Sequence, residues 1–117
     1  MSASADSGNL FRDAAPPAQG ERFDELLRHR QLVVERIVSS AAITPTDYVQ
    51  AQDEWVLLVR GEAELRVAGE LRTLKAGDYV FLPAGTPHRV ERTQAGTLWL
   101  AVHLHPDVSG QAGRLSQ

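Results

Sequence analysis

The chain of 117 residues has no cysteine, no strong positive charge and no long apolar run. Without cysteine, disulfides and thiolate metal sites are excluded. The net charge of −3 argues against the basic surface that binds nucleic acid or an anionic membrane. No apolar run approaches the length of a membrane span, and the first residues, MSASADSGNLFRD, lack the layout of a secretion signal. We therefore expect a cytoplasmic protein without nucleic-acid or membrane partners.

The length fits one domain that is large enough to bury a core. Residues 1–20 are rich in Ser, Ala, Gly and Pro, which predicts a flexible N-terminal tail. Residues 109–117 have a similar composition and predict a flexible C-terminal tail. The domain is expected over residues 21–108. At its start, residues 23–30 carry apolar side chains at a spacing of three and four, which predicts one or two helical turns.

From Gln31 onward the sequence has the texture of β-strands. The strand-like stretches are separated by glycine-containing turns and read LVVERIVSS, EWVLLVR, AELRV, DYVFLP, HRVER and TLWLAVHLH. Short strands at regular spacing predict an all-β, antiparallel sandwich or barrel. EWVLLVR and TLWLAVHL are apolar on both faces, so the outer face needs a cover, and a homodimer is expected. Trp55 and Trp99 are accordingly interpreted as packing or interface residues.

One turn interrupts this pattern at fixed spacing. In GDYVFLPAGTPH, Gly77 is followed by Pro83, Gly85 and His88. Glycine permits backbone angles that other residues avoid, and proline stiffens the turn, so the turn should aim His88 into a pocket. The spacing resembles the second motif of the cupin superfamily, G-x5-P-x-G-x2-H-x3-N. Only the last position differs, where Arg92 is either a charge at the barrel mouth or a solvated strand end.

The first cupin motif, G-x5-H-x-H-x3-or-4-E-x6-G, is matched in part. Glu54 and Gly61 match, while Tyr48 and Gln50 stand at the two histidine positions and Ala42 at the leading glycine. The stretch is similar to a subgroup of small single-domain cupins that reads T-P-x-x-Y-x-Q-x-x-x-E-W-V. The resemblance spans residues 33–105 and implies a single antiparallel cupin-type β-barrel, that is, a double-stranded β-helix or jelly roll. The subgroup carries no settled reaction.

Strand geometry supports the same positions independently. Residues two apart on a strand share a face. One face carries four polar residues followed by two core residues, namely Tyr48, Gln50, Gln52, Glu54, Val56 and Leu58. If that face is inward, the polar groups enter the barrel together, and His88 meets them from a neighbouring strand.

Cupins hold a divalent ion with three histidines and one glutamate, so the resemblance implies a metal site. The corresponding ligands here are His88, Glu54, Gln50 and Tyr48. Imidazole and carboxylate suit Fe, Mn, Ni or Zn. The amide oxygen of Gln50 is a weak ligand, and the phenol of Tyr48 must lose its proton to bind strongly. A metal-free pocket, in which the four side chains hydrogen-bond one another, is the alternative.

His103 and His105 form a second His-x-His pair near the end of the last strand. If residues 92–98 form a hairpin with an even loop, His103 pairs near His88 and faces inward. If the loop has the three residues 94–96, His103 faces outward, because a slip of one residue reverses every side chain. His103 is kept as a candidate ligand-binding residue, and His105, next to Pro106, is expected at the surface.

These residues predict a small-molecule site inside the barrel. Glu54 and Tyr48 are the candidate catalytic residues, and Gln50, His88 and His103 the candidate ligand-binding residues. A buried carboxylate has a raised pKa and can act as a general acid or base, and a tyrosine hydroxyl can hydrogen-bond an anionic oxygen.

Three functions stay open. The first is a small-molecule site inside the barrel with a bound divalent metal or the remnant of one, which as an enzyme would isomerise, oxidise or hydrolyse a small polar metabolite. The second is a non-catalytic, metal-free binding module, which the missing histidines favour over the first. The third is a structural partner protein, and the gathering of polar residues on one inward face argues against it.

Overall fold

The computed structural model describes residues 6–107 and contains eight strands and no helix in that range. The strands are β1 (Glu21–His29), β2 (Leu32–Ser39), β3 (Asp53–Arg60), β4 (Glu62–Val67), β5 (Glu70–Lys75), β6 (Tyr79–Leu82), β7 (His88–Thr93) and β8 (Thr97–Leu104). All pair antiparallel, which confirms the predicted all-β class. Nothing in residues 6–107 forms a helix able to cross a membrane. The predicted C-terminal tail lies outside the described residues, as do residues 1–5.

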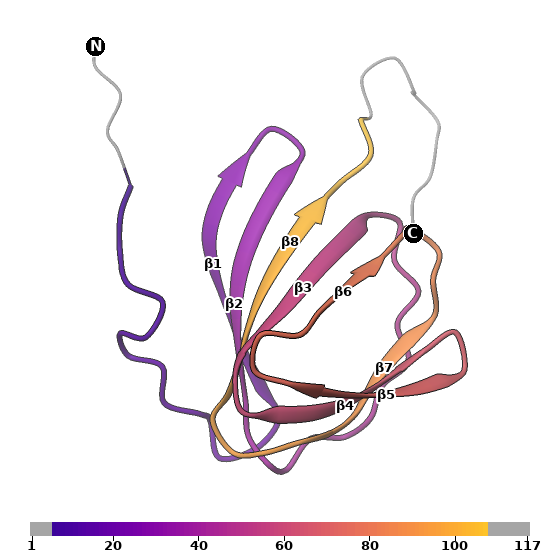
Figure 1. Cartoon of the computed structure of the whole chain (residues 1–117). Coiled ribbons are helices and arrows are strands. Elements are labelled where there is room, and N and C mark those ends of the chain that lie inside the picture. Colours follow the sequence, from indigo (N-terminus) through magenta and orange to yellow (C-terminus); the bar gives the residue numbers. More distant parts are fainter. Residues whose placement is uncertain (1–5, 108–117) are drawn as a thin grey trace.

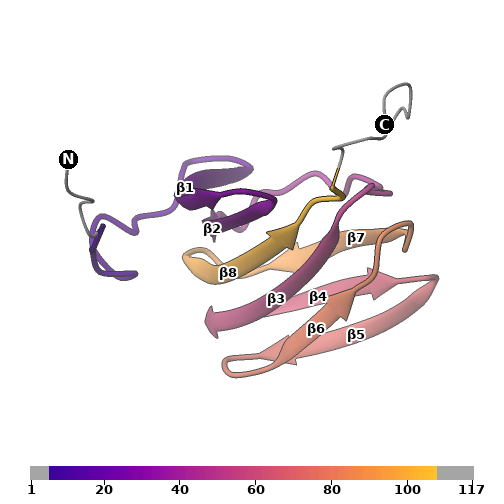
Figure 2. The same ribbon diagram turned by 90° about the horizontal axis from the view of Figure 1, so that it is seen from above.

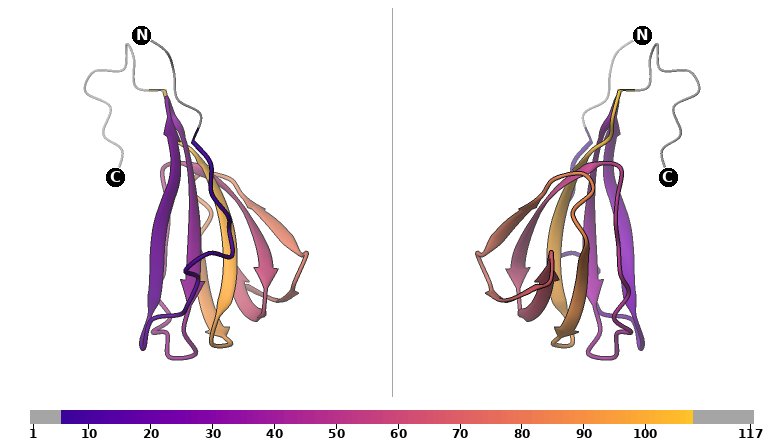
Figure 3. Two further views of the ribbon diagram at one scale, coloured as in Figure 1. Left: turned by 90° about the vertical axis from the view of Figure 1, so that its left-hand side faces the viewer. Right: turned by 90° about the vertical axis from the view of Figure 1, so that its right-hand side faces the viewer.

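The strands form two sheets that face each other (Figures 1 and 2). The larger sheet has the order β1-β2-β8-β3-β6, and the smaller one has the order β5-β4-β7. The chain passes from one sheet to the other at four connections, β3–β4, β5–β6, β6–β7 and β7–β8. Figure 3 gives two side views of this arrangement. Among the described residues no ladder joins the two sheets, so the predicted barrel is not closed, although a jelly roll fits the arrangement.

The core lies between the sheets and is formed by alternate residues of their facing strands. It comprises Val56, Leu58, Ala63, Leu65, Val67, Leu74, Val80, Leu82, Trp99 and Ala101. The expectation that Val56 and Leu58 continue the inward face as core is confirmed. Full burial of one such large apolar side chain stabilises the fold by about 1.5–3 kcal/mol.

The prediction of helical turns over residues 23–30 is wrong, because residues 23–29 belong to β1. β1 pairs with β2 along its whole length, and a bulge between Glu25 and Leu27 shifts the register by one residue. The bulge breaks the two-residue alternation of the strand, and the apolar spacing then imitates that of a helix. Pairing with β2 thus overrides the local pattern.

Part of the segment before β1, which was predicted to be a flexible tail, contacts the larger sheet. The buried guanidinium of Arg36 donates hydrogen bonds to the Leu10 and Arg12 carbonyl oxygens, at 3.0 and 2.6 Å. The Phe11 ring centroid lies 5.7 Å from the guanidinium carbon of Arg60. These contacts join residues 10–12 to β2 and β3.

The outer face of the larger sheet is apolar near β6. Tyr79 and Phe81 are 66% and 56% exposed, and the Tyr79 ring centroid lies 5.5 Å from that of Trp55. Trp55 therefore belongs to this outer face, whereas Trp99 is buried between the sheets.

Candidate functional site

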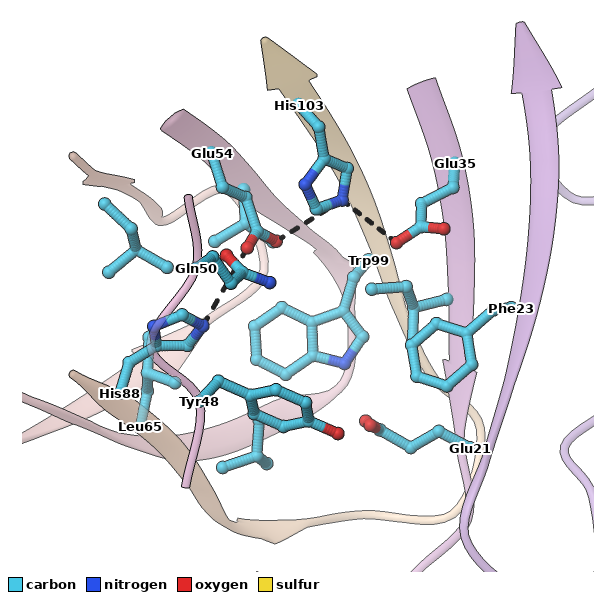
Figure 4. A pocket seen from close by; sticks show the side chains of 14 residues that line it. Glu21, Phe23, Glu35, Tyr48, Gln50, Glu54, Leu65, His88, Trp99 and His103 are labelled. Atoms are coloured by element: carbon cyan, nitrogen blue, oxygen red, sulfur yellow. Dashed lines mark hydrogen bonds and ion pairs between the residues drawn. The ribbon is translucent and has the colours of Figure 1, made fainter. Parts of the chain in front are cut away.

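A pocket of about 130 Å³ lies between the sheets. Figure 4 shows its 14 lining residues, which come from seven strands and from the segment before β3. They are Glu21, Phe23, Glu35, Ile37, Tyr48, Gln50, Glu54, Val56, Leu65, Leu82, His88, Val90, Trp99 and His103. The structure therefore brings all five site residues predicted from the sequence to one pocket.

The turn before β7 places His88 in this pocket. Gly85 has a φ of +84°, and its N–H donates to the Gln50 carbonyl oxygen at 2.8 Å. Tyr48 and His88 exchange two backbone hydrogen bonds, both of 2.9 Å. The turn thereby fixes the segment that carries Tyr48 and Gln50 against the start of β7. A glycine suits the turn because other residues rarely adopt positive φ.

The ring of His88 is oriented by the same turn. Its Nδ1–H donates to the Thr86 carbonyl oxygen at 3.0 Å, so Nε2 faces the pocket. Nε2 lies 3.9 Å from Oε1 of Glu54, and the imidazole is 9% exposed. The ring stacks on that of Tyr48, with 5.8 Å between the centroids.

Glu54 lies at the centre of the polar side of the pocket and is 6% exposed. Its Oε2 lies 3.9 Å from Nε2 of His103, as far as its Oε1 lies from His88. Both distances are too long for a hydrogen bond, and Gln50 donates the hydrogen bond that Glu54 accepts. Burial raises the pKa of Glu54, and the nearby histidines and Gln50 offset this rise only in part.

His103 faces the pocket, and neither hairpin considered from the sequence explains why. Residues 94–96 do form the connection, but they carry the chain from one sheet to the other, so β7 and β8 are not paired. The facing direction of His103 is set instead by β8 lying between β2 and β3, where His103 stands opposite Val33 and Glu54.

Both ring nitrogens of His103 have partners. Nε2 donates to Oε1 of Glu35 at 3.0 Å, and Nδ1 lies 3.3 Å from Nε2 of Gln52. Burial by itself lowers the pKa of His103, but the hydrogen bond to Glu35 and the charges of Glu54 and Glu35 outweigh it, so the pKa is raised. The result is a row, Glu35–His103–Glu54–His88, along one side of the pocket (Figure 4).

The opposite end of the pocket contains Glu21. Its carboxylate accepts a hydrogen bond from the Ser39 hydroxyl, which in turn accepts one from the indole N–H of Trp99 at 3.0 Å. Burial raises the pKa of Glu21, and the Ser39 hydrogen bond opposes that rise. Figure 4 shows the Tyr48 hydroxyl pointing toward Glu21 and away from Glu54.

The sequence analysis missed Glu21 and Glu35 as site residues. A signal for Glu35 existed, because it alternates with Val33 and Ile37 on what is otherwise an apolar strand face. Arg92 does not line the pocket, and its exposed guanidinium pairs with Glu64 at 3.0 Å.

The residues present do not fit the four-ligand metal site that the resemblance implies. Within residues 6–107, no three His, Asp or Glu side chains are placed to hold an ion. Nε2 of His103 is engaged by Glu35, and the Tyr48 hydroxyl points away from Glu54. Of the side chains in residues 6–107, only those of Glu54 and His88 therefore direct strong donor atoms to one point.

Residues 34–103 match the family model described as the cupin domain. The chain belongs to the cupin family. This small cupin is 39% identical to a candidate mannose-6-phosphate isomerase from Ralstonia eutropha, with a TM-score of 0.77, over 86% of this chain and 98% of that one. An RmlC-like cupin from Shewanella frigidimarina shares the fold, at 17% identity and a TM-score of 0.73, over 92% of this chain and 96% of that one.

An uncharacterized protein from Streptomyces coelicolor is 27% identical over 95 residues, which are 81% of this chain and 90% of the relative. The family resemblance predicted from the two motifs is thereby confirmed.

Proposed function

We propose that this cupin binds a small organic molecule in the pocket and that Glu54 exchanges a proton with it. The observation that carries the proposal is the position of Glu54, a buried carboxylate on the pocket wall with an imidazole 3.9 Å from each oxygen. A ligand atom between these groups would be within the hydrogen-bonding reach that proton transfer requires.

The neighbouring residues would support this transfer in different ways. His103, held by Glu35, would present a proton beside Glu54, and Gln50 would orient the Glu54 carboxylate. Tyr48, predicted as a catalytic residue, has its hydroxyl directed toward Glu21. We therefore assign Tyr48 to ligand binding.

The ligand would be compact and unphosphorylated. A pocket of about 130 Å³ is close to the roughly 150 Å³ cavity that holds a benzene molecule. The name of the Ralstonia relative suggests a sugar phosphate, but phosphate is bound by Arg, Lys or converging backbone N–H groups. Among the described residues that line the pocket, none is Arg or Lys.

The first test is a ligand screen with a matched pair of tyrosine variants. Small compounds are screened by ligand-detected NMR, and each hit is repeated with Tyr48→Ala and with Tyr79→Ala, which alters the outer face. Loss of the ring at the pocket should weaken binding about two- to twelvefold, because an aromatic contact contributes about 0.5–1.5 kcal/mol. The outer-face variant should bind like the original protein.

The second test concerns proton transfer. Each hit is incubated with the protein in D₂O, and exchange of its carbon-bound hydrogens is followed by NMR, with Glu54→Gln as the comparison. Exchange that disappears in the variant supports an enzymatic site. Binding without exchange would overturn the catalytic part and leave the metal-free binding module, and a screen without any pocket-dependent hit would overturn the proposal itself.

We also propose that the exposed apolar face around Tyr79 and Phe81 packs against a second copy of this chain. Monomeric proteins rarely expose large contiguous apolar patches, and both rings are more than half exposed. The cytoplasmic location expected from the sequence stays a prediction, whereas the side chains of the pocket argue against the Fe, Mn, Ni or Zn ion in a four-ligand site.

A further inference from the structure

We propose that the pocket selects a small organic cation, namely a primary ammonium on a compact apolar body, and that Glu21 recognises the ammonium group. The inference rests on the proposed function, because it names the class of ligand for the same pocket. It is carried by three features of the pocket: its charge, its aromatic surfaces, and the arrangement of its two polar ends.

With its three carboxylates ionised, the pocket carries a negative charge in every protonation state of its histidines. Three carboxylates, Glu21, Glu35 and Glu54, reach it from β1, β2 and β3. Among the described residues, the lining contains two histidines and no Lys or Arg. With the carboxylates ionised and both imidazoles protonated, the sum is −3 + 2 = −1. An anionic ligand would therefore be repelled, and a cation would be attracted.

The apolar part of the pocket suits the body of such a cation. Trp99 is 3% exposed and lies between the two polar ends of the pocket, while Phe23 and Tyr48 are 54% and 44% exposed and lie on its sides (Figure 4). Aromatic rings attract a nearby ammonium group through the negative charge on their faces. A cation would thus gain from the same rings that bury its apolar body.

The two polar ends differ in what they leave available. At one end, the hydrogen bonds from Trp99 to Ser39 and from Ser39 to Glu21 hold the Glu21 carboxylate in place, and the Tyr48 hydroxyl points toward it. The oxygens of the Glu21 carboxylate and of the Tyr48 hydroxyl can accept hydrogen bonds from an ammonium group, which has only donors.

At the other end, Nε2 of His88 is directed into the pocket and makes no hydrogen bond within residues 6–107, although its side chain is only 9% exposed. A buried polar nitrogen without a hydrogen-bond partner indicates that an occupant or a water molecule belongs there. This observation is independent of the carboxylates. With the ammonium at Glu21, the far end of the ligand would lie against His88 and Glu54, where the proposed proton transfer takes place.

The test compares three probes of equal size and different charge: benzylammonium, benzyl alcohol and benzoate. Each is titrated into the ¹⁵N-labelled protein. The indole N–H signal of Trp99 reports the pocket, and that of Trp55 on the outer face is the internal control. Because charge-assisted hydrogen bonds are roughly twice as strong as neutral ones, benzylammonium should bind about tenfold more tightly than benzyl alcohol, and benzoate should not bind.

Glu21→Gln removes the charge and keeps the size of the side chain. It should weaken benzylammonium about tenfold and leave benzyl alcohol unchanged, which a merely structural role would not do. Glu25→Gln, on the same strand but outside the pocket, should change neither. The spectrum of each variant shows whether its fold is intact.

The outcomes separate this inference from the proposed function. If benzyl alcohol or benzoate shifts the Trp99 signal with an affinity equal to or greater than that of benzylammonium, the charge selection is wrong while the pocket still binds small molecules. If benzylammonium binds equally well to Glu21→Gln, the role of Glu21 is wrong. If none of the three probes shifts the Trp99 signal, the inference fails, and the broader ligand screen then decides whether the proposed function fails with it.

Discussion

Replacing Glu35 by glutamine should lower the pKa of His103 and destabilise the protein only at a pH where His103 is protonated. Oε1 of Glu35 lies 3.0 Å from Nε2 of His103, and the two side chains are 21% and 8% exposed. Glutamine keeps an oxygen in this position but removes the negative charge that favours the imidazolium. The other titratable groups facing His103 are Glu54, at 3.9 Å, and His105, whose ring centroid lies 6.2 Å away.

The magnitude follows from the type of hydrogen bond that is changed. A hydrogen bond to a charged group contributes about 1.5–3 kcal/mol and a neutral one about 1 kcal/mol, so the free energy of unfolding should fall by about 0.5–2 kcal/mol. The folded pKa of His103 is raised. Its contribution is therefore fully present below the unfolded value of about 6.5 and is lost as the pH rises through the folded value.

At higher pH the charge of Glu35 no longer stabilises the original protein. His103 is then neutral, and the charge of Glu35 raises the pKa of Glu54, which is a repulsion between the two carboxylates. Removing the Glu35 charge relieves that repulsion. At about pH 9 the variant should thus be at least as stable as the original protein.

The assay is urea unfolding followed by tryptophan fluorescence at about pH 5.5 and pH 9, together with an NMR titration of the histidine rings. His103→Gln identifies the signal of His103. Glu64→Gln is the matched control, because its partner Arg92 stays charged throughout this range. An equal loss of stability at both pH values, or an unchanged titration of His103, would refute the reasoning.

Three further predictions concern the backbone, the metal and the outer face. Gly61→Ala should lower the free energy of unfolding in urea by about 3–5 kcal/mol, since φ is +95° and the added Cβ would lie 2.6 Å from Oγ1 of Thr97. Gly77→Ala is the comparison, because its φ is +97° but its Cβ would meet open space, and it should cost about 1–2 kcal/mol in the same assay. Elemental analysis of the purified protein should find less than one transition-metal ion per chain. One ion per chain that is lost in His88→Ala would restore the four-ligand interpretation. Light scattering should find a dimer that Phe81→Glu converts to a monomer, and a monomeric original protein would refute the proposed interface.

The parts of the site that the sequence predicts are those set by local backbone requirements. Pro83, Gly85 and His88 lie within one turn, whose positive φ and stiff prolines depend on residues that are adjacent in the chain. The inward direction of Glu54 and Val56 follows from alternation along one strand, which needs no knowledge of its neighbours.

The remaining parts depend on which strands become neighbours. The direction of His103 is set by the pairing of β8 with β2 and β3, and a hairpin argument could not reach it because β7 pairs with β4 in the other sheet. Glu21 and Glu35 enter the pocket because the β1–β2 hairpin joins the edge of β8. The short polar strand β5 was likewise missed, since only Leu74 in it is buried.

The charge of the site connects these findings. The family's metal site combines three neutral histidines with one glutamate, so its ligands carry a charge of −1 that the divalent ion more than balances. Here Tyr48 and Gln50 replace two of the histidines, while His103, Glu35 and Glu21 add one imidazole and two carboxylates from neighbouring strands. With neutral imidazoles the lining carries −3, which is costly in a partly buried pocket. Protonation of His103 offsets part of that charge, and an organic cation beside Glu21 would offset more, which is why the glutamates rather than the lost histidines should determine what this cupin binds.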